Sequence, residues 1–459
     1  MDYIIILGGG ESGLWSALLA QKQGSRVLLS DSGMLSTKTR ELLAQSHIPY
    51  EEGGHLLPDL EQATAVIKSP GIPDTAPVVL RCREAGVPIL SEPEYAARFA
   101  GTSTLIGITG SNGKTTTTTL TAYLLRACGL DAIACGNIGT SLAHCVASDP
   151  HDYYVIELSS FQLDHMYDTD LRVAALLNVT PDHLDRYDHS LDKYADAKWR
   201  IFRAQTPDDL HIINLDDPIT RQLIDRSPAL CSREYTFSLK DDRATAYYRD
   251  GIIRIHTDRD TTAELDFADM RLKGEHNAAN VMAACLILSA LGVQTALRDG
   301  TVQKALNHFA GIPHRMEHVG TWHGVTMIND SKATNIDATH YALGAMAPAS
   351  TILILGGTDK GNDYNDILPL VRQKCKALIY LTTDSQKLHA TFDPLPIPAY
   401  DVRSMPEAFE RLRLLDTKPG DTFLLSPACA SFDLFHNYEH RGDCFRDEAR
   451  KLAGTQTEA

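Results

Sequence analysis

The chain repeats one hydrophobic pattern: a short uninterrupted apolar run, then a loop of glycine or polar residues, then a stretch with helical spacing. The run Tyr3–Leu7 opens the chain in this way, and Leu105–Ile108, Tyr153–Ile156 and Ile352–Leu355 repeat it further on. Such runs are typical of strands that are buried on both faces of a parallel sheet. The pattern predicts an α/β protein whose strand carboxyl ends face ligand crevices.

The stretch Thr104–Thr119 holds the clearest candidate chemistry in this pattern. Its apolar strand enters a glycine turn, and a helix is expected over Thr116–Cys128. Such a turn exposes backbone N–H groups that bind phosphate, while a lysine and a hydroxyl after it suit β/γ-phosphates and Mg²⁺. The spacing departs from G-x-x-x-x-G-K-[ST] at Ile108, so a plain turn with a solvated lysine is the alternative. The predicted phosphate-binding residues are Gly110, Ser111, Asn112, Gly113, Lys114, Thr115 and Thr116.

The first segment, residues 1–95, has a second glycine turn. Gly8–Gly13 fits the spacing G-x-G-x-x-G, a helical stretch Leu14–Gln23 follows, and Asp31 comes after the next strand. This is a Rossmann-like βαβ opening, which places the turn near a diphosphate. NAD, another diphosphate ligand such as a nucleotide sugar, and a purely structural turn stay open. Ser69 and Gly71 lie in a later loop that faces the same crevice or is a simple turn.

The middle segment, residues 96–311, adds acidic and amide residues after its strands. Glu157 follows the strand Tyr153–Ile156, where an acid completes a Mg²⁺ site in phosphate-binding proteins or lies near the start of the next helix. Asn137 lies in another glycine loop. His183 stands among acids and is either a metal ligand or a loop histidine.

Lys198 occupies an unusual place on a predicted helix over Leu191–Phe202. At 100° per residue it lies in the middle of an apolar face with Tyr194 and Ile201. Burial there lowers the pKa of a lysine and favours the neutral amine, which reacts with CO₂ to give a carbamate that binds hard cations. The alternative is a lysine whose amine reaches solvent at the rim of the apolar face.

The last segment, residues 312–459, has three strands that each end in a polar loop. The strands are Val325–Ile328, Ile352–Leu355 and Phe423–Leu425. Their loops supply Lys332, Thr334, Lys360 and Ser431, which together suit a small dianion; ordinary helix starts are the alternative.

Composition excludes several other classes. The chain has 459 residues, which predicts two to four domains, and a net charge of −16, which argues against nucleic-acid binding. Its nine cysteines form no C-x-x-C pair, so we expect reduced thiols in the cytoplasm. We expect no signal peptide, and the longest apolar run is too short for a membrane span.

The middle motifs GSNGKT, GNIG, ELSSFQL, NVTPDHLDRY and YADAKWRIF occur in an order that resembles the Mur ligases. These are ATP-dependent amide-forming enzymes of peptidoglycan synthesis. The resemblance implies three domains over 1–95, 96–311 and 312–459: a Rossmann-like N-terminal domain that binds the UDP substrate, a central P-loop ATPase-like domain, and a Rossmann-like C-terminal domain that binds the amino acid. It implies two Mg²⁺ ions, one held by Thr115 and Glu157 and one by His183 and carbamylated Lys198.

The C-terminal motifs NDSKATN, GG-x-x-K and SPACASFD resemble the branch of the family that adds D-glutamate to UDP-N-acetylmuramoyl-L-alanine. This resemblance implies further nucleotide contacts at Asn277, Arg315 and Asp330; an N-cap is the alternative for Asn277. It implies that Lys114, Glu157, His183 and Lys198 are catalytic. The implied substrate-binding residues are Asp31, Ser69, Gly71, Asn137, Ser159, Lys332, Thr334, Lys360, Ser431, Phe432 and Tyr438.

The resemblance also implies the reaction. The substrate carboxylate attacks the γ-phosphate of ATP, and the amine of D-glutamate then attacks the acyl phosphate. We expect a cytoplasmic monomer with small-molecule partners, no nucleic acid and no membrane, whose domains close on ATP. The rival hypotheses are a nucleotide-dependent regulator without amide chemistry and a sister ligase that adds a different amino acid.

Overall fold

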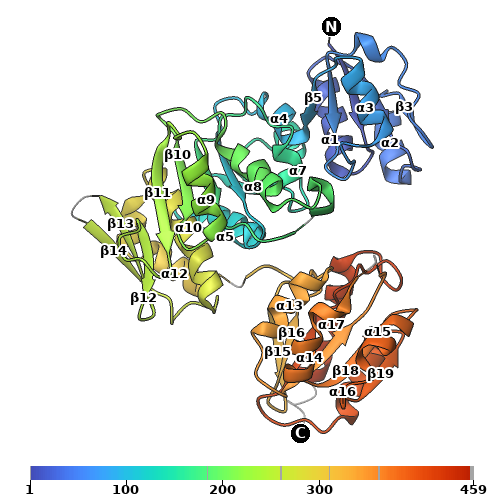
Figure 1. Ribbon diagram of the computed structural model, residues 1–459, viewed down its shortest axis with the longest axis vertical. Helices are drawn as coiled ribbons and strands as arrows, with labels where there is room; N and C mark the ends of the chain where they lie inside the picture. Colours follow the sequence, from blue (N-terminus) through green and yellow to red (C-terminus); the bar gives the residue numbers. More distant parts are fainter. Residues whose placement is uncertain (1, 183, 259–260, 310, 360–361, 455–459) are drawn as a thin grey trace. The chain divides into compact units, whose positions relative to one another are not determined.

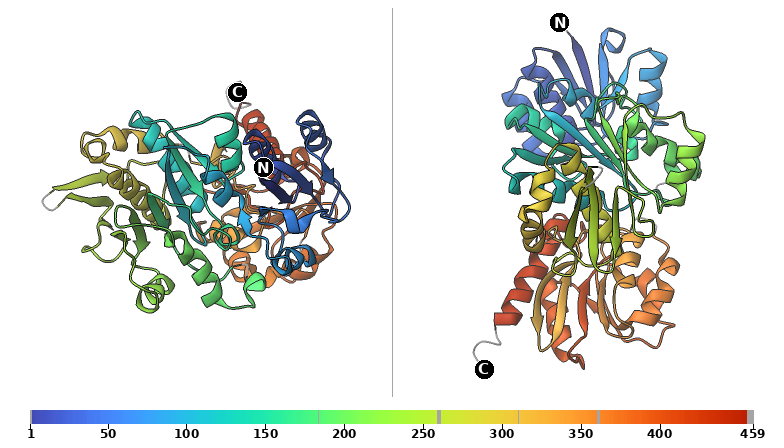
Figure 2. Two further views of the ribbon diagram at one scale, coloured as in Figure 1. Left: turned by 90° about the horizontal axis from the view of Figure 1, so that it is seen from above. Right: turned by 90° about the vertical axis from the view of Figure 1, so that its left-hand side faces the viewer.

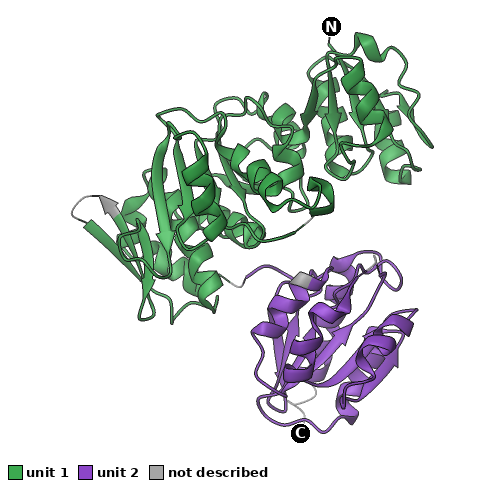
Figure 3. Ribbon diagram, in the orientation of Figure 1, with its two compact units in different colours: residues 1–309 green, residues 310–459 purple. Residues whose placement is uncertain are grey.

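The computed structural model describes residues 2–182, 184–258, 261–309, 311–359 and 362–454. The chain divides into two compact units, Met1–Phe309 and Ala310–Ala459 (Figure 3). Two β-sheets lie in the first unit and one lies in the second (Figure 1). The predicted α/β class is confirmed. The residue ranges of the three domains proposed from the sequence stay predictions.

The first sheet has five parallel strands in the order β3-β2-β1-β4-β5. Its central strand β1 (Tyr3–Leu7) sends Ile4 and Ile6 into one buried apolar cluster and Ile5 and Leu7 into another. Both faces are covered, so the apolar run has no polar alternation. The other elements are β2 (Arg26–Ser30), β3 (Tyr50–Glu51), β4 (Ala65–Lys68), β5 (Ile89–Ser91), α1 (Glu11–Lys22), α2 (Thr37–Gln45), η1 (Leu60–Gln62), α3 (Pro77–Glu84) and α4 (Glu92–Ala97).

The second sheet has nine strands in the order β14-β13-β12-β11-β10-β9-β6-β8-β7. Strand β6 (Thr104–Thr109) lies between β8 (Tyr153–Glu157) and β9 (Val173–Leu176), parallel to both. Their carboxyl ends therefore meet at one edge. The remaining strands are β7 (Ala132–Gly136), β10 (Leu210–Asn214), β11 (Arg233–Ser238), β12 (Ala246–Arg249), β13 (Ile252–Asp258) and β14 (Thr261–Asp266). The helices are α5 (Lys114–Ala127), α6 (Leu142–Ser148), α7 (Ser160–Leu163), η2 (Leu184–Tyr187), α8 (Leu191–Trp199), η3 (Arg200–Phe202), α9 (Pro218–Arg226), α10 (Glu275–Ala290), α11 (Gln294–Arg298) and α12 (Thr301–His308).

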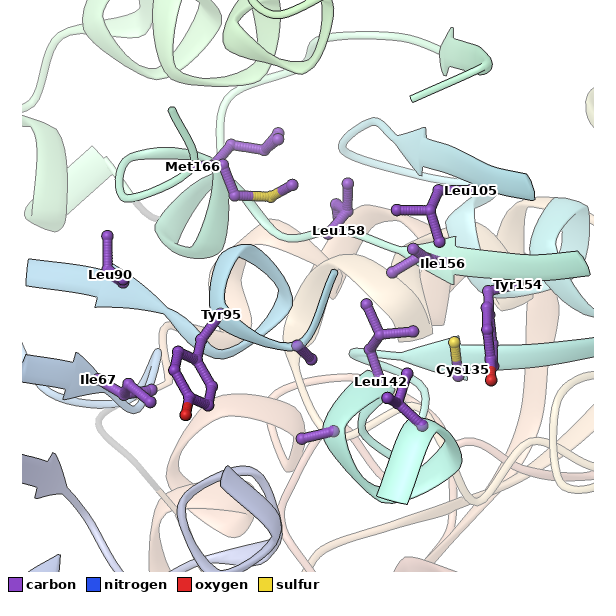
Figure 4. Close-up of a cluster of buried hydrophobic side chains, with 14 of the residues drawn as sticks. Ile67, Leu90, Tyr95, Leu105, Cys135, Leu142, Tyr154, Ile156, Leu158 and Met166 are labelled. Atoms are coloured by element: carbon purple, nitrogen blue, oxygen red, sulfur yellow. The ribbon is translucent and has the colours of Figure 1, made fainter. Parts of the chain in front are cut away.

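One apolar cluster joins the two sheets of the first unit. Leu90 of β5 and Tyr95 of α4 belong to the same buried cluster as Leu142 of α6 and Ile156 of β8 (Figure 4). Because apolar burial is the dominant favourable term in folding, this cluster fixes α4 and α6 against each other. The start of α6 is thereby brought next to the glycine turn of the first sheet, where Ser141 contacts Glu11.

The sheet of the second unit has six strands in the order β15-β16-β20-β17-β18-β19. Helices lie on both sides of this sheet (Figure 2). Two apolar clusters cover its faces: Leu353 and Leu355 enter one, and Ile352 and Ile354 the other. The elements are β15 (Glu317–Trp322), β16 (Val325–Asn329), β17 (Thr351–Leu355), β18 (Cys375–Leu381), β19 (Ala399–Val402), β20 (Thr422–Leu425), α13 (Ile336–Gly344), η4 (Tyr364–Asp366), α14 (Leu368–Lys374), α15 (Gln386–Phe392), α16 (Met405–Leu414) and α17 (Tyr438–Gly454).

Several predicted elements differ at their ends. The helix after the phosphate turn begins at Lys114 and not at Thr116, and α1 begins at Glu11 and not at Leu14. In both cases the helix begins earlier along the glycine motif than the sequence suggested. The helix expected over Leu191–Phe202 is α8 followed by the 3₁₀ turn η3.

Two further expectations have structural outcomes. All nine cysteines are free thiols, as their spacing predicted. Within the described ranges, no helix has both the length and the apolar character that crossing a membrane requires.

Candidate active site

The phosphate turn lies between β6 and α5 and depends on two glycines. Gly110 and Gly113 have φ angles of 157° and 84°, a region that favours glycine. A Cβ on Gly113 would stand 2.4 Å from Oδ1 of Asn280. Thr115 and Thr116 lie buried in the first turn of α5. The turn therefore has the strand–turn–helix geometry that the phosphate-binding prediction requires.

Two polar residues after β9 hold this turn in place. Asn178 Oδ1 accepts from the Asn112 backbone N–H at 2.8 Å, and Asn178 Nδ2 donates to the Asn112 carbonyl at 3.1 Å. Ser111 Oγ donates to the Thr180 carbonyl and accepts from the Thr180 N–H, both at 2.9 Å. No role was predicted for Asn178 or Thr180 from the sequence. Their position directly after a strand next to β6 was the available signal.

Lys114 folds its side chain back into the turn. Its Nζ donates to the Gly110 carbonyl at 2.8 Å and to the Ser111 carbonyl at 2.9 Å. The solvated-lysine alternative is therefore wrong, since the amine lies within the loop. The ammonium group adds positive charge where the backbone N–H groups of the turn and the helix dipole already favour an anion.

Lys198 is buried, with 1% of its surface exposed, so the solvent-reaching alternative is wrong. Its Nζ donates to the Gly110 carbonyl at 2.8 Å and lies 4.5 Å from the centre of the Tyr194 ring. Burial lowers the pKa of Lys198 well below its ordinary value, and the nearby charge of Lys114 lowers it further. The charges of Asp182 and Glu157 oppose this shift. The structure thus places a lysine with a lowered pKa directly under the phosphate turn. Its carbamylation stays a prediction.

Glu157 ends β8 and is 3% exposed. Its Oε1 accepts from Asn137 Nδ2 at 3.2 Å, and its backbone carbonyl accepts from the Asn137 N–H at 3.0 Å. Glu157 also lies two residues before the N-cap of the next helix, so its position agrees with both interpretations given for it above. That helix, α7, is capped by Ser159, whose hydroxyl bonds Gln162 in a capping box. The local role of Ser159 is therefore this cap, and its substrate role stays a prediction.

The second carboxylate oxygen of Glu157 shows whether a cation fits beside the phosphate turn. Its Oε2 is buried and has no hydrogen-bond partner in the described part of the chain. An unpartnered buried carboxylate oxygen is costly unless a cation or donor binds it. Carboxylate and hydroxyl oxygens are the ligands that Mg²⁺ prefers, and Thr115 supplies the hydroxyl. The donor set fits Mg²⁺. His183 lies outside the described residues.

Asn277 lies in the first turn of α10. Gly274, and not Asn277, is the N-cap of this helix, so the capping interpretation is wrong. Asn277 Nδ2 donates to the Lys273 carbonyl at 2.9 Å, and its Oδ1 accepts from Asn280 Nδ2 at 3.1 Å. Asn280 Oδ1 in turn accepts from Thr117 Oγ1 at 3.3 Å. Asn280, which the sequence analysis missed, thus joins α10 to the helix of the phosphate turn.

The glycine turn of the first sheet borders a cavity of about 610 Å³. Asp31 Oδ2 accepts from the Gly9 N–H at 2.6 Å, which fixes the turn. A Cβ on Gly13 would stand 1.8 Å from the Gly8 carbonyl oxygen, so the third glycine is needed for close packing. The lining includes Gly10, Glu11, Trp15, Lys38, Thr140 and His144. We call this cavity the glycine-turn pocket.

Ser69 and Gly71 follow β4 at the carboxyl edge of the same sheet. The Ser69 hydroxyl is buried and has no hydrogen-bond partner among the described residues. A buried hydroxyl without a partner is a site where a ligand oxygen would restore the lost bond. This favours the ligand-facing interpretation of the loop over a plain turn.

In the second unit, the three polar loops follow neighbouring strands. β20 pairs in parallel with β16 on one side and β17 on the other, so the loops that begin near Asp330, Ser426 and Gly356 share one edge. Asp330 is buried, and its carboxylate accepts from Ser426 Oγ at 2.9 Å and from the Met316 N–H at 3.2 Å. Burial raises the pKa of Asp330 to about 7, although the hydrogen bonds from Ser426 and Met316 and the charge of Arg315 act to lower it.

The residues predicted to bind the amino acid lie on these loops. Ser431 is buried, while Phe432 is 68% exposed. The Lys332 amine lies 5.8 Å from the centre of the Tyr438 ring, and the Thr334 N–H donates to the Lys332 carbonyl at 2.9 Å. Lys360 lies outside the described residues.

Arg441 holds two of these loops together and received no role from the sequence. It is buried, and its guanidinium donates to the Ser331 hydroxyl at 2.9 Å, to the Ser331 carbonyl at 2.8 Å and to the Cys429 carbonyl at 3.1 Å. Ser331 precedes Lys332, and Cys429 lies just before Ser431. One side chain from α17 thus sets the spacing between the two predicted amino-acid loops.

Known proteins resemble the chain along its whole length. A family model described as the MurD N-terminal domain matches residues 3–78, the Mur ligase middle domain matches residues 108–288, and the Mur ligase, glutamate ligase domain matches residues 314–429. The UDP-N-acetylmuramoylalanine–D-glutamate ligase of Bacteroides thetaiotaomicron is 46% identical over 98% of this chain and 100% of its own length. The enzyme of the same name from Porphyromonas gingivalis is 47% identical over 98% of each chain.

Solved structures share the fold at lower identity. The UDP-N-acetylmuramate-alanine ligase of Thermotoga maritima aligns with a TM-score of 0.58 at 20% identity, covering 100% of this chain and 99% of that one. The MurF ligase of Thermotoga maritima, solved in complex with ADP, aligns with a TM-score of 0.59 at 14% identity, covering 94% and 95%.

Proposed function

The chain belongs to the Mur ligase family, and on that basis we propose that it joins D-glutamate to UDP-N-acetylmuramoyl-L-alanine in an ATP-driven step of peptidoglycan precursor synthesis. The observation that carries the proposal is the phosphate turn with the buried Lys198 amine bonded to its Gly110 carbonyl. The likeness to the D-glutamate-adding relatives over 98% of the chain supports the choice of substrates.

The reaction we propose has two steps. A carboxylate oxygen of UDP-N-acetylmuramoyl-L-alanine attacks the γ-phosphorus of ATP, and the bond to the β-phosphate oxygen breaks, giving an acyl phosphate and ADP. The D-glutamate amine then attacks the acyl carbon, loses a proton and expels inorganic phosphate. Positioning and charge neutralisation provide most of the catalysis in such transfers. The backbone N–H groups of residues 110–115 cradle the phosphates, and Lys114 exchanges its loop carbonyls for phosphate oxygens.

The oxygen ligands of the site fit Mg²⁺, and we propose that Thr115 and Glu157 hold one ion while His183 and Lys198 hold a second. Bound Mg²⁺ neutralises phosphate charge and orients the transferring group. The unpartnered Oε2 of Glu157 supports this assignment. Asn137 holds the other carboxylate oxygen, so Glu157 cannot rotate freely away from the phosphate turn.

We also propose that Lys198 is carbamylated. A neutral amine attacks CO₂, a C–N bond forms, and one proton leaves to solvent, so the product is an anionic oxygen ligand. The low pKa of Lys198 and its lack of an ion-pair partner in the described part of the chain support this step. The carbonyl of Gly110 accepts a hydrogen bond from a neutral amine as well as from an ammonium group.

We propose ligand contacts for the other residues of the predicted site. Asp31, Ser69 and Gly71 bind the UDP substrate, and Asn137 and Ser159 contact its reacting end. Asn277, Arg315 and Asp330 contact the nucleotide. Lys332, Thr334, Lys360, Ser431, Phe432 and Tyr438 bind D-glutamate. We propose a cytoplasmic location, because ATP and UDP-linked precursors are cytoplasmic compounds, and we propose that the enzyme is a monomer.

Phosphate release tests the proposal. The full chain is incubated with ATP, Mg²⁺ and UDP-N-acetylmuramoyl-L-alanine, and D-glutamate, L-alanine or a diamino acid is added in separate reactions. We expect strong release only with D-glutamate and only when the UDP substrate is present. Stimulation by another amino acid would identify a sister ligase. Binding of ATP without any amide product would identify a nucleotide-dependent regulator.

A further inference from the structure

Glu11 lies in the glycine turn of the first sheet. Its carboxylate contacts the start of α6, the helix that follows strand β7 of the second sheet. Its Oε1 and Oε2 each accept from the Ser141 backbone N–H at 3.1 Å, and Oε1 also accepts from Ser141 Oγ at 3.1 Å. Oε1 lies 3.2 Å from His144 Nδ1. Ser141 is the N-cap of α6. A carboxylate from one sheet therefore caps a helix that belongs to the other.

The two segments joined by Glu11 form walls of one pocket. Gly10, Glu11 and Trp15 line the glycine-turn pocket from α1 and its turn, and Thr140 and His144 line it from α6 and the loop before it. The rings of Trp15 and His144 stack with centroids 3.7 Å apart and planes at 9°. A ligand that fills this pocket thus touches both segments at the place where Glu11 connects them.

Loop 136–141 connects Glu11 to Glu157, because its residues bond to Glu11 at one end and to Glu157 at the other. The Gly136 N–H donates to the Thr140 carbonyl at 2.8 Å, which closes the loop that ends at Ser141. Within this loop, Asn137 donates its backbone N–H and its side-chain amide to Glu157, at 3.0 Å and 3.2 Å. Because both ends of the loop are tied, displacing Ser141 displaces Asn137 and changes the orientation of the Glu157 carboxylate.

We propose that Glu11 is a positioning residue that fixes loop 136–141 when the UDP substrate fills the glycine-turn pocket, and that it thereby sets Glu157 at the phosphate turn. The inference rests on the proposed function, since that function supplies a UDP ligand for the pocket and a nucleotide for the turn. Its consequence is that the pocket and the phosphate turn bind their ligands with mutual tightening, and that Glu11 is required for this tightening.

Glu92 provides the matched control because it caps the same helix without lining the pocket. Its Oε1 accepts from the Ala143 N–H at 2.6 Å, and it is buried. Burial raises the pKa of Glu92 to about 8, so this side chain is neutral at pH 7. Glu92→Gln therefore preserves both the shape and the charge at α6, whereas Glu11→Gln removes a charge at the pocket wall.

The experiment compares the wild type, Glu11→Gln and Glu92→Gln by titration calorimetry with UDP as the pocket ligand, with and without saturating ADP. We expect ADP to tighten UDP binding at least about fivefold in the wild type and in Glu92→Gln, and to have no effect in Glu11→Gln. In steady-state kinetics, Glu11→Gln should raise the KM for UDP-N-acetylmuramoyl-L-alanine about tenfold, because the charge-assisted hydrogen bonds to Ser141 are lost. The change in kcat should be smaller.

The inference is overturned if ADP tightens UDP binding equally in all three proteins, or if it has no effect in the wild type. It is also overturned if Glu11→Gln lowers only the melting temperature, because a purely structural cap would do the same. If Glu11→Gln does not fold, Glu11→Asp replaces it and should show an intermediate loss of tightening. Failure of D-glutamate to stimulate phosphate release would refute the proposed function, while the calorimetry would still decide the role of Glu11.

Discussion

Two buried lysines in the first unit differ in what receives their hydrogen bonds. Lys68 ends β4, and its Nζ lies 2.8 Å from the Ile72 carbonyl oxygen and 3.2 Å from Asp74 Oδ1. Lys198 Nζ donates to the Gly110 carbonyl, and no carboxylate forms an ion pair with it in the described ranges. Burial lowers the pKa of both lysines. For Lys68 the next largest influence is the charge of Asp74, which opposes the shift, whereas for Lys198 it is the charge of Lys114, which adds to the shift. A buried lysine with a carboxylate stays a structural cation, while one with only a carbonyl has a neutral form available for chemistry.

The surroundings of Asp74 strengthen this contrast. Its carboxylate lies 2.8 Å from His165 Nε2 and 3.1 Å from an Arg83 nitrogen. Burial acts to raise the pKa of Asp74, but the interactions with His165 and then with Lys68 outweigh it and hold this pKa below its ordinary value. The result is a charge network between the first sheet and the loop after α7, beside a cavity of about 780 Å³ lined mainly by charged side chains. This network fixes the loop that bears Ser69 and Gly71, so its role is architectural.

The largest expected effect comes from removing the Lys198 amine. Lys198→Met keeps the length of the side chain but supplies neither an amine nor a carbamate, so we expect kcat/KM for phosphate release to fall about a thousandfold. The melting temperature should change by less than about 4 °C, because an apolar side chain of similar volume is tolerated where an unpaired amine was buried. Bicarbonate or a short-chain acid should partly restore the activity of Lys198→Ala. Full activity in either variant would remove the carbamate from the mechanism.

A moderate effect is expected from the corresponding change at the other lysine. Lys68→Met leaves Asp74 with one cation fewer, so unfolding should become easier by about 1–2 kcal/mol. This is less than for a fully buried pair, since the Asp74 side chain is 37% exposed and keeps His165 and Arg83. We expect kcat within about threefold of wild type and a higher KM for the UDP substrate. Chemical denaturation and steady-state kinetics measure both. A loss of kcat as large as for Lys198→Met, with unchanged stability, would contradict the contrast between the two lysines.

A buried acid extends the comparison from catalysis to the pH dependence of stability. Burial raises the pKa of Asp330 to about 7, so the folded state binds more protons than the unfolded state between roughly pH 4 and pH 7. The stability from Asp330 is therefore fully present at low pH and is lost as the pH rises towards 7, by at most about 1.4 kcal/mol per pH unit. Asp330→Asn should flatten this part of the pH–stability curve, measured by denaturant unfolding. Parallel curves for the two proteins would show that burial does not control this carboxyl group.

Part of the site followed from local sequence. The phosphate turn, the strand before it and the helix after it were predicted correctly, because glycine spacing and apolar periodicity are properties of neighbouring residues. Helical spacing also placed Lys198 on an apolar face, but it left open whether the amine is buried or reaches solvent at the rim, and the structure shows that it is buried. The ends of elements were less accurate: α5 begins inside the glycine turn at Lys114, where threonines have weak helix preference and the turn geometry decides.

The sequence by itself thus determined where many of the strands and helices lie, where the phosphate turn lies and which lysine stands on an apolar helix face. Only the tertiary structure decided which distant polar groups meet. Asn112 and Asn178 are 66 residues apart, Ser141 and Glu11 are 130 apart, and Thr117 and Asn280 are 163 apart. Hydrophobic periodicity repeats every two or 3.6 residues and contains no information about strand order. These contacts exist because the order of strands in each sheet, and the apolar cluster between the first two sheets, place the partners side by side.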